Sequence, residues 1–92
     1  MKIFVTFSGQ VRRVARVARE SFEFEDSQPL QEFTAWLAEK HGEPLKSSLL
    51  DDSGLPQRIL LVSVNDEQVG AAERKILRDG DEVTFMSPIS GG

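Results

Sequence analysis

Residues 27–42 read SQPLQEFTAWLAEKHG and carry the start, the periodicity and the stop of an amphipathic α-helix. Ser27 is the expected N-cap, Pro29 suits the first turn, and Gly42 is a frequent terminator. The large apolar side chains between these signals fall on or beside one stripe of the helix: Leu30, Phe33, Trp36 and Leu37. A helix with such a stripe is stable when a sheet covers it, so strands are expected in the flanking segments.

Two alternating segments precede this helix. Residues 2–8 and 21–25 alternate apolar with other side chains, which predicts two half-buried strands that pair as a ribbon. Between them, Gly9-Gln10 breaks the pattern. Residues 11–18 place a valine at every third position among arginines, which fits neither template, so we expect a loop or a short irregular turn there.

Turn residues divide the second half of the chain into short segments. Residues 58–64 are almost continuously aliphatic, which predicts a central strand buried on both faces. The other expected segments are a connector over 43–57 with one helical turn at 45–50, a short strand around 68–69, a brief helical or irregular crossing over 71–77, a turn at 79–81 and a last strand over 82–86.

The order β-β-α-β-β-β predicts an α+β domain over residues 1–86. Its mixed sheet of four to five strands is covered on one face by a single main helix. Residues 87–92 are expected to form a flexible C-terminal tail that ends in Gly-Gly. The predicted core consists of Ile3, Val5, Phe7, Phe22, Phe24, Leu30, Phe33, Leu37, Val83 and Phe85.

Composition removes several function classes. The 92 residues suffice for one domain and contain no cysteine, which excludes thiol nucleophiles, thiolate metal sites and disulfides. A net charge of −4 argues against nucleic acid as the main partner. No apolar signal core follows Met1, and the longest aliphatic run covers only residues 59–62, so we expect a cytoplasmic chain without a membrane partner.

One basic segment stands out on this acidic chain. Arg12, Arg13, Arg16 and Arg19 supply four of the eleven basic residues. They are explained either as a solvated loop with structural ion pairs or as a docking patch for an acidic partner.

Two further features suggest chemistry but have simpler explanations. His41 lies just before Gly42, where a cation ordinarily interacts with the end of a helix, and the chain has no second histidine to assist it. Asp51-Asp52 is more typical of a turn than of a metal site, because hard cations require more ligands than this segment offers. We therefore expect no bound metal.

The last two residues, Gly91 and Gly92, are the strongest indication of function. Two residues without side chains can enter a slot that would exclude any Cβ, which makes the Gly92 α-carboxylate the first candidate for a reacting group. Frayed chain ends are also rich in glycine, so the pair alone decides nothing. The six residues 87–92 would reach roughly 20 Å at about 3.3 Å per residue, far enough to enter a partner's active site.

Three segments, in this order of elements, resemble a known family. They are VSVN at 62–65, LRDGDEV at 77–83 and FMSPISGG at 85–92. The chain is similar to the ubiquitin-like sulfur carriers, which have the β-grasp fold, and within them most similar to the small subunit of molybdopterin synthase. It departs from that pattern in the arginine-rich segment, in the long 43–57 connector, and in Ser87, which stands where a second proline is frequent.

The resemblance implies a carrier without a catalytic site of its own. Gly92 would be adenylated by an E1-like activating enzyme that uses ATP, and a sulfur donor (a sulfurtransferase) would convert it to a thiocarboxylate. The large subunit of molybdopterin synthase would then receive the sulfur. This chain has no phosphate-binding glycine loop, so we expect ATP to be bound by the activating enzyme and no cofactor by the carrier.

The resemblance and the strand pattern also suggest where partners bind. Gly91 would give access, and Ile89 and Ser90 would line the partner's channel, together with Ser87 and Pro88 of the spacer. Phe4 and Met86 alternate out of phase with the core, so they are candidates for a contact on the uncovered sheet face.

Other functions share the same terminus. The sulfur could instead go to the thiazole of thiamin, to thiolated tRNA or to an amino-acid pathway. Activated Gly92 could also form isopeptide bonds with lysines of target proteins. The fourth alternative is a noncovalent interaction module whose terminal glycines have no role.

Overall fold

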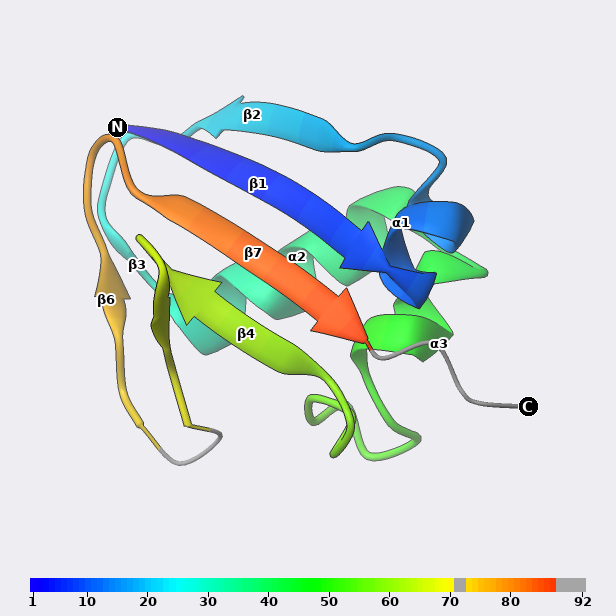
Figure 1. Cartoon of the computed structure of the whole chain (residues 1–92). Helices are drawn as coiled ribbons and strands as arrows, with labels where there is room; N and C mark the ends of the chain where they lie inside the picture. The colour runs from blue at the N-terminus through cyan, green and yellow to red at the C-terminus, as the bar shows by residue number, and fades with distance from the viewer. Residues whose placement is uncertain (71–72, 88–92) are drawn as a thin grey trace.

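A computed structural model of the chain describes residues 1–70 and 73–87 (Figure 1). Its elements, in chain order, are β1 (Lys2–Gly9), α1 (Gln10–Ala15), β2 (Arg19–Glu23), β3 (Gln28–Pro29), α2 (Leu30–His41), α3 (Leu45–Leu49), β4 (Leu61–Val64), β5 (Glu67–Gln68), β6 (Ile76–Leu77) and β7 (Glu82–Ser87). No helix in these residues combines the length and apolar content needed to cross a bilayer.

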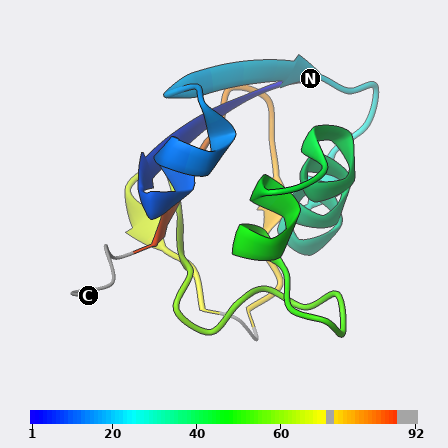
Figure 2. The ribbon, with the colours of Figure 1, turned by 90° about the vertical axis from the view of Figure 1, so that its right-hand side faces the viewer.

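The main sheet is mixed and has the strand order β2-β1-β7-β4-β5. Its two central strands, β1 and β7, run parallel, while β2, β4 and β5 pair antiparallel with their neighbours. The helices α2 and α3 lie on one side of this sheet, and the other side is uncovered by helices (Figures 1 and 2). The predicted α+β class, with a five-stranded mixed sheet and a main helix on one face, is confirmed.

The core lies between α2 and the alternate residues of the central strands. Ile3, Val5 and Phe7 of β1 and Val83 and Phe85 of β7 are fully or almost fully buried. They pack with the stripe of α2 that the sequence indicated, Leu30, Phe33 and Leu37. This packing leaves the intervening residues of β1 and β7 on the uncovered face.

Two predicted core residues, Phe22 and Phe24, are only partly buried. Both rings make T-shaped contacts with the Trp36 ring, with centroid distances of 5.1 and 4.9 Å. Trp36 itself is 38% exposed, so these three rings cover the side of the core rather than fill it.

The segment expected to be a loop at 11–18 was predicted wrongly, because it begins with the helix α1. Val11 and Ala15 are both buried and lie four residues apart, which places them on one helical face against β1 and β7. Arg16 ends the helix in the left-handed conformation, at φ 65°. The strand β2 follows at 19–23, two residues earlier than predicted.

Ser27 is not the N-cap of the main helix. The cap residue is Pro29, and no side chain caps this end. The physical reason is a short ribbon that the sequence did not reveal: Gln28 and Pro29 pair with Leu77 and Ile76 as β3 and β6, so the chain stays extended until Leu30. The predicted end of the helix at Gly42 is confirmed.

The segment 58–64 is a strand only over Leu61–Val64, and it is not buried on both faces. Helices cover the sheet on one side alone (Figures 1 and 2), so only one face of β4 is buried. Val64 is buried, whereas Leu61 is 38% and Ile59 is 65% exposed. The predicted helical turn at 45–50 is confirmed as α3.

Candidate functional site

The end of β7 is held against the first helix by an unusually close backbone contact. Gly9 pairs with Ser87 in the parallel β1–β7 register and has φ +67°. A Cβ added to Gly9 would lie 2.2 Å from the Ser87 carbonyl oxygen, a distance that no side chain tolerates. Glycine is therefore required where the chain passes from β1 into α1 beside the last residue of β7.

Ser87 was expected to begin the tail and to contact a partner, but the structure places it inside the body. It belongs to β7 and is 6% exposed. Its buried Oγ makes no hydrogen bond to any other part of residues 1–70 and 73–87. The other predicted tail residues, Pro88, Ile89, Ser90, Gly91 and Gly92, lie outside the described residues.

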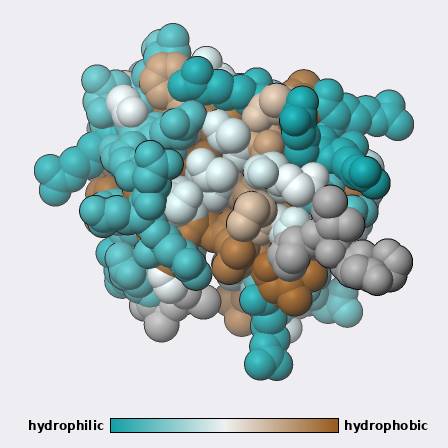
Figure 3. Space-filling view, viewed as in Figure 1, coloured by the Kyte–Doolittle hydropathy of each residue, from teal (hydrophilic) through white to brown (hydrophobic). Residues whose placement is uncertain are grey.

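An apolar patch lies on the uncovered face next to this end of β7. Met86 was predicted to lie there and is 38% exposed. Its cross-strand partner is Leu61 of β4, which is exposed to the same extent. We call Leu61 and Met86 the tail-base patch. Figure 3 shows hydrophobic side chains gathered toward this part of the face, below a band of intermediate hydropathy.

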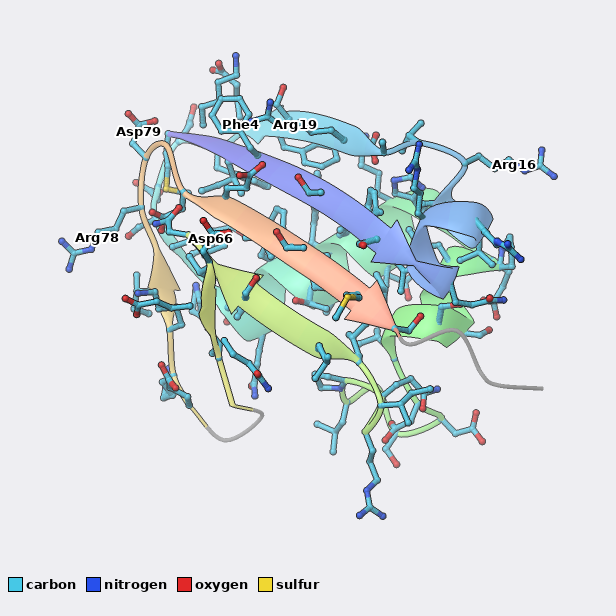
Figure 4. All side chains as sticks on the ribbon, viewed as in Figure 1. Phe4, Arg16, Arg19, Asp66, Arg78 and Asp79 are labelled. Atoms are coloured by element: carbon cyan, nitrogen blue, oxygen red, sulfur yellow. The ribbon has the colours of Figure 1, made fainter. Side chains whose placement is uncertain are left out.

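Phe4 lies on the same face but far from this patch. Along β1 it pairs with Glu82, whereas Met86 pairs with Ser8, so the two candidates are four residues or about 13 Å apart along the strands. The guanidinium of Arg19 lies over the Phe4 ring at 4.7 Å (Figure 4). Arg19 also contacts the Glu82 carboxylate at 3.4 Å. The structure therefore does not bring Phe4 and Met86 into one apolar surface.

The arginine-rich segment divides into two parts. Arg19 belongs to β2 and to the cluster around Phe4. By contrast, Arg12, Arg13 and Arg16 project from α1 and its C-cap and line an open hollow together with Gly9, Val17 and Ala18. Within the described residues, none of these three arginines has an ion pair with a carboxylate.

His41 and Asp51 have structural roles. The His41 Nε2 atom lies 2.5 Å from the Glu20 Oε1 atom, and the His41 ring makes a T-shaped contact with the Phe7 ring at a centroid distance of 5.8 Å. The Asp51 carboxylate accepts hydrogen bonds from the backbone N–H groups of Ser53 and Leu55, which closes a turn. In the part of the chain that the structure describes, no three histidine or acidic side chains are grouped to hold a metal.

The sheet order and the single-sided helical layer define the class of protein: this is a ubiquitin-like β-grasp domain. The crystal structure of SAMP1 from Haloferax volcanii superposes with a TM-score of 0.83 at 21% identity, covering all of both chains. The solution structure of Urm1 from Trypanosoma brucei gives 0.80 at 23% identity, covering 99% of this chain and 95% of Urm1. At these identities the likeness concerns the fold.

The chain belongs to the ThiS family, whose model matches residues 5–92. It is 29% identical over 92 residues, the full length of both chains, to the molybdopterin synthase sulfur carrier subunit of Chlamydomonas reinhardtii. It is also similar to a chain in the complex of subunits 1 and 2 of the molybdopterin-converting factor from Helicobacter pylori, with a TM-score of 0.59, 25% identity and full coverage of both chains. The resemblance that the sequence motifs indicated is confirmed.

Proposed function

We propose that this protein is a sulfur carrier that acts as the small subunit of a molybdopterin synthase. The observation that carries the proposal is the 29% identity to a sulfur carrier subunit over 92 residues, with all of both chains aligned. Membership of the ThiS family supports it. The carrier would supply the reacting carboxylate and a rigid body, and its partners would supply the catalytic groups.

The chemistry we propose takes place at Gly92. An E1-like enzyme joins the Gly92 carboxylate to the α-phosphate of ATP, and pyrophosphate leaves. A sulfide equivalent, delivered by a sulfur donor, then attacks the carbonyl carbon and expels AMP, which leaves a thiocarboxylate. Adenylation is needed because a carboxylate oxygen is a poor leaving group, whereas AMP is a good one.

The body of the protein is suited to present such a terminus. Ser87 is buried at the end of the middle strand β7 and pairs with Gly9 of β1, which gives residues 88–92 a fixed starting point. Five residues can span about 17 Å when extended, enough for Gly92 to enter a channel while Gly91 adds no side chain to obstruct it. Pro88, Ile89 and Ser90 would then line that channel.

We propose that the tail-base patch contacts the large subunit. Leu61 and Met86 form a pair of exposed apolar side chains beside Ser87, so a protein that encloses residues 88–92 would also cover them. The Helicobacter pylori neighbour is described as a complex of two subunits, which supports a partner of this kind.

The proposal is tested by intact mass spectrometry. The protein is incubated with the E1-like activating enzyme, ATP and a sulfur donor. We expect its mass to rise by the difference between one sulfur and one oxygen atom, and a variant that lacks Gly92 to gain nothing. Addition of the large subunit together with its sulfur-accepting substrate should reverse the gain, because the substrate takes the sulfur and water restores the carboxylate. An unchanged mass with an active enzyme set would refute the carrier role.

The same reagents distinguish the alternatives. Loss of the added sulfur to a thiamin or tRNA pathway, but not to the large subunit, would assign another acceptor. Covalent adducts on lysines of other proteins, abolished by the deletion of Gly92, would indicate protein modification instead.

A further inference from the structure

We propose that Arg12, Arg13 and Arg16 form a docking patch for an acidic protein surface that surrounds the channel into which residues 88–92 insert. This inference rests on the proposed function and adds to it the charge of the partner surface. The three residues are called the α1 arginines below.

The first observation is that the α1 arginines are exposed and lack carboxylate partners, although the chain has an excess of acids. There are 15 acidic and 11 basic residues, and cations elsewhere do form ion pairs: Arg19 with Glu82, and Lys46 with Glu39. No carboxylate of the described residues lies within ion-pair distance of the α1 arginines. Their positive charge is therefore available to another molecule.

The second observation is that the charge is polarised. The net charge of the whole chain is −4, so the net charge of the molecule without the three α1 arginines is −7. A basic end on an acidic body orients the molecule in the field of a partner. Such an arrangement raises the association rate with an acidic surface and disfavours approach by the other end.

The third observation is the position of these residues. The helix α1 packs against β1 and β7, and Gly9, directly before it, pairs with Ser87. The basic end is thus the end at which β7 reaches residue 87. Figure 4 shows Arg16 at this end and Arg78 at the opposite one. A protein that receives residues 88–92 would have its channel entrance close to α1.

The geometry favours a protein surface over a small anion or a nucleic acid. The hollow between the α1 arginines is open, and Arg12, Arg13 and Arg16 are all exposed. A compact anion site usually gathers donors around an enclosed ligand, whereas separate exposed cations suit several carboxylates spread over a surface. A net charge of −4 also opposes binding to a phosphate backbone.

The test is a charge reversal with a matched control. The double variant Arg12→Glu/Arg13→Glu reverses the charge of two exposed side chains of α1 and removes no buried contact, so it is expected to fold. The control, Arg74→Glu/Arg78→Glu, makes the same change in net charge at exposed residues that form no ion pair within residues 1–70 and 73–87. Folding of both variants is checked by circular dichroism and thermal unfolding.

The measurement is the association rate constant with two probes, the E1-like activating enzyme and the large subunit, by stopped-flow fluorescence. At about 50 mM NaCl we expect the α1 variant to associate about tenfold more slowly than the wild type with at least one probe, while the control changes little. At about 500 mM NaCl the difference should disappear, because salt screens the charges.

The outcomes separate this inference from the proposed function. If the wild type binds a probe and the α1 variant associates equally fast at low salt, or the control slows by the same factor, the docking patch is refuted and the carrier role stands. If the wild type binds neither probe, both are refuted. If pyrophosphate shifts the amide NMR signals of residues 12–16 while partner rates stay unchanged, the patch binds a small anion instead and the proposal is overturned.

Discussion

At the scale of single residues, two glycines show how similar backbones can carry different constraints. Gly9 and Gly42 have φ values of +67° and +68°, and each flanks a helix end. A Cβ on Gly42 would meet nothing within 4 Å, whereas a Cβ on Gly9 would collide with the backbone of Ser87. Conformation alone requires glycine at position 42, while conformation and space both require it at position 9.

This difference predicts unequal effects of alanine. Gly42→Ala should lower the free energy of unfolding by about 1–3 kcal/mol, the usual cost of forcing a side chain into such a conformation. Gly9→Ala should lose that amount and about 1–3 kcal/mol more, because β1 and β7 must separate to admit the methyl group. Urea unfolding of both variants measures the difference. Equal losses would contradict the proposed contact with Ser87.

At the scale of elements, the sequence correctly predicted the strands and helices whose buried residues recur at a regular spacing within one segment. The strand β1 and the stripe of α2 have clear periods, and Gly42 and the connector prolines are explicit signals. The helix α1 was missed because it has only six residues, of which two are arginines. The spacing of Val11 and Ala15 could have indicated it, but two positions are too few to establish a period.

Features that depend on register could not be found in this way. β3 and β6 have two residues each and exist only because they pair across more than 40 residues of chain. The contact of Arg19 with Phe4 and Glu82 likewise requires β1 to lie between β2 and β7. The exposure of Leu61 was not predicted, because the aliphatic run around it suggested a strand buried on both faces. The exposure of Met86 on the uncovered face was predicted correctly. The roles of Gly91 and Gly92 remain predictions.

The contribution of Glu43, which lies just before the short helix α3, to the stability of the fold is expected to depend on pH. The Glu43 carboxylate accepts hydrogen bonds from the Ser47 hydroxyl and from the Ser47 backbone N–H, at 2.5 and 2.8 Å. These bonds, with that of the hydroxyl the larger cause, hold the pKa of Glu43 below its ordinary value of 4.5. A lowered pKa stabilises the fold above the unfolded value, and this contribution is lost as the pH falls through the folded value.

We therefore expect Glu43→Gln to be less stable than the wild type at pH 7 and to approach it in stability as the pH falls below 4. The size of the effect should be small because Glu43 is exposed. Thermal unfolding over a pH series measures it, with Glu25→Gln as the control because Glu25 is exposed and lies outside the helices and strands. A constant difference at all pH values would show that the hydrogen bonds to Ser47 are not the cause.

At the scale of the whole molecule, three features share one end: Ser87 at the end of β7, the tail-base patch and the α1 arginines. The cluster of Phe4, Arg19 and Glu82 lies further along the central strands toward the other end. A partner that engages residues 88–92 would therefore meet apolar side chains on one side of β7 and cations on the other.

This arrangement predicts the effect of charge in the apolar patch. Met86→Asp should weaken binding of the large subunit by about tenfold or more, because a carboxylate buried in an apolar contact without a partner is unfavourable. The control is Ile76→Asp on β6, which removes a side chain of similar exposure, 42%, away from the main sheet. Isothermal titration calorimetry provides the affinities, and unchanged binding by Met86→Asp would exclude the patch from the interface.

The parallel pairing of β1 with β7 also affects how the protein is made. The middle strand of the sheet is the last to be synthesised, so a nascent chain on the ribosome lacks the partner of both β1 and β4 until residue 87 has emerged. Pairing of strands this distant in sequence is slow and occurs late in folding. Chains interrupted before that point would leave the apolar faces of β1 and β4 exposed to proteases.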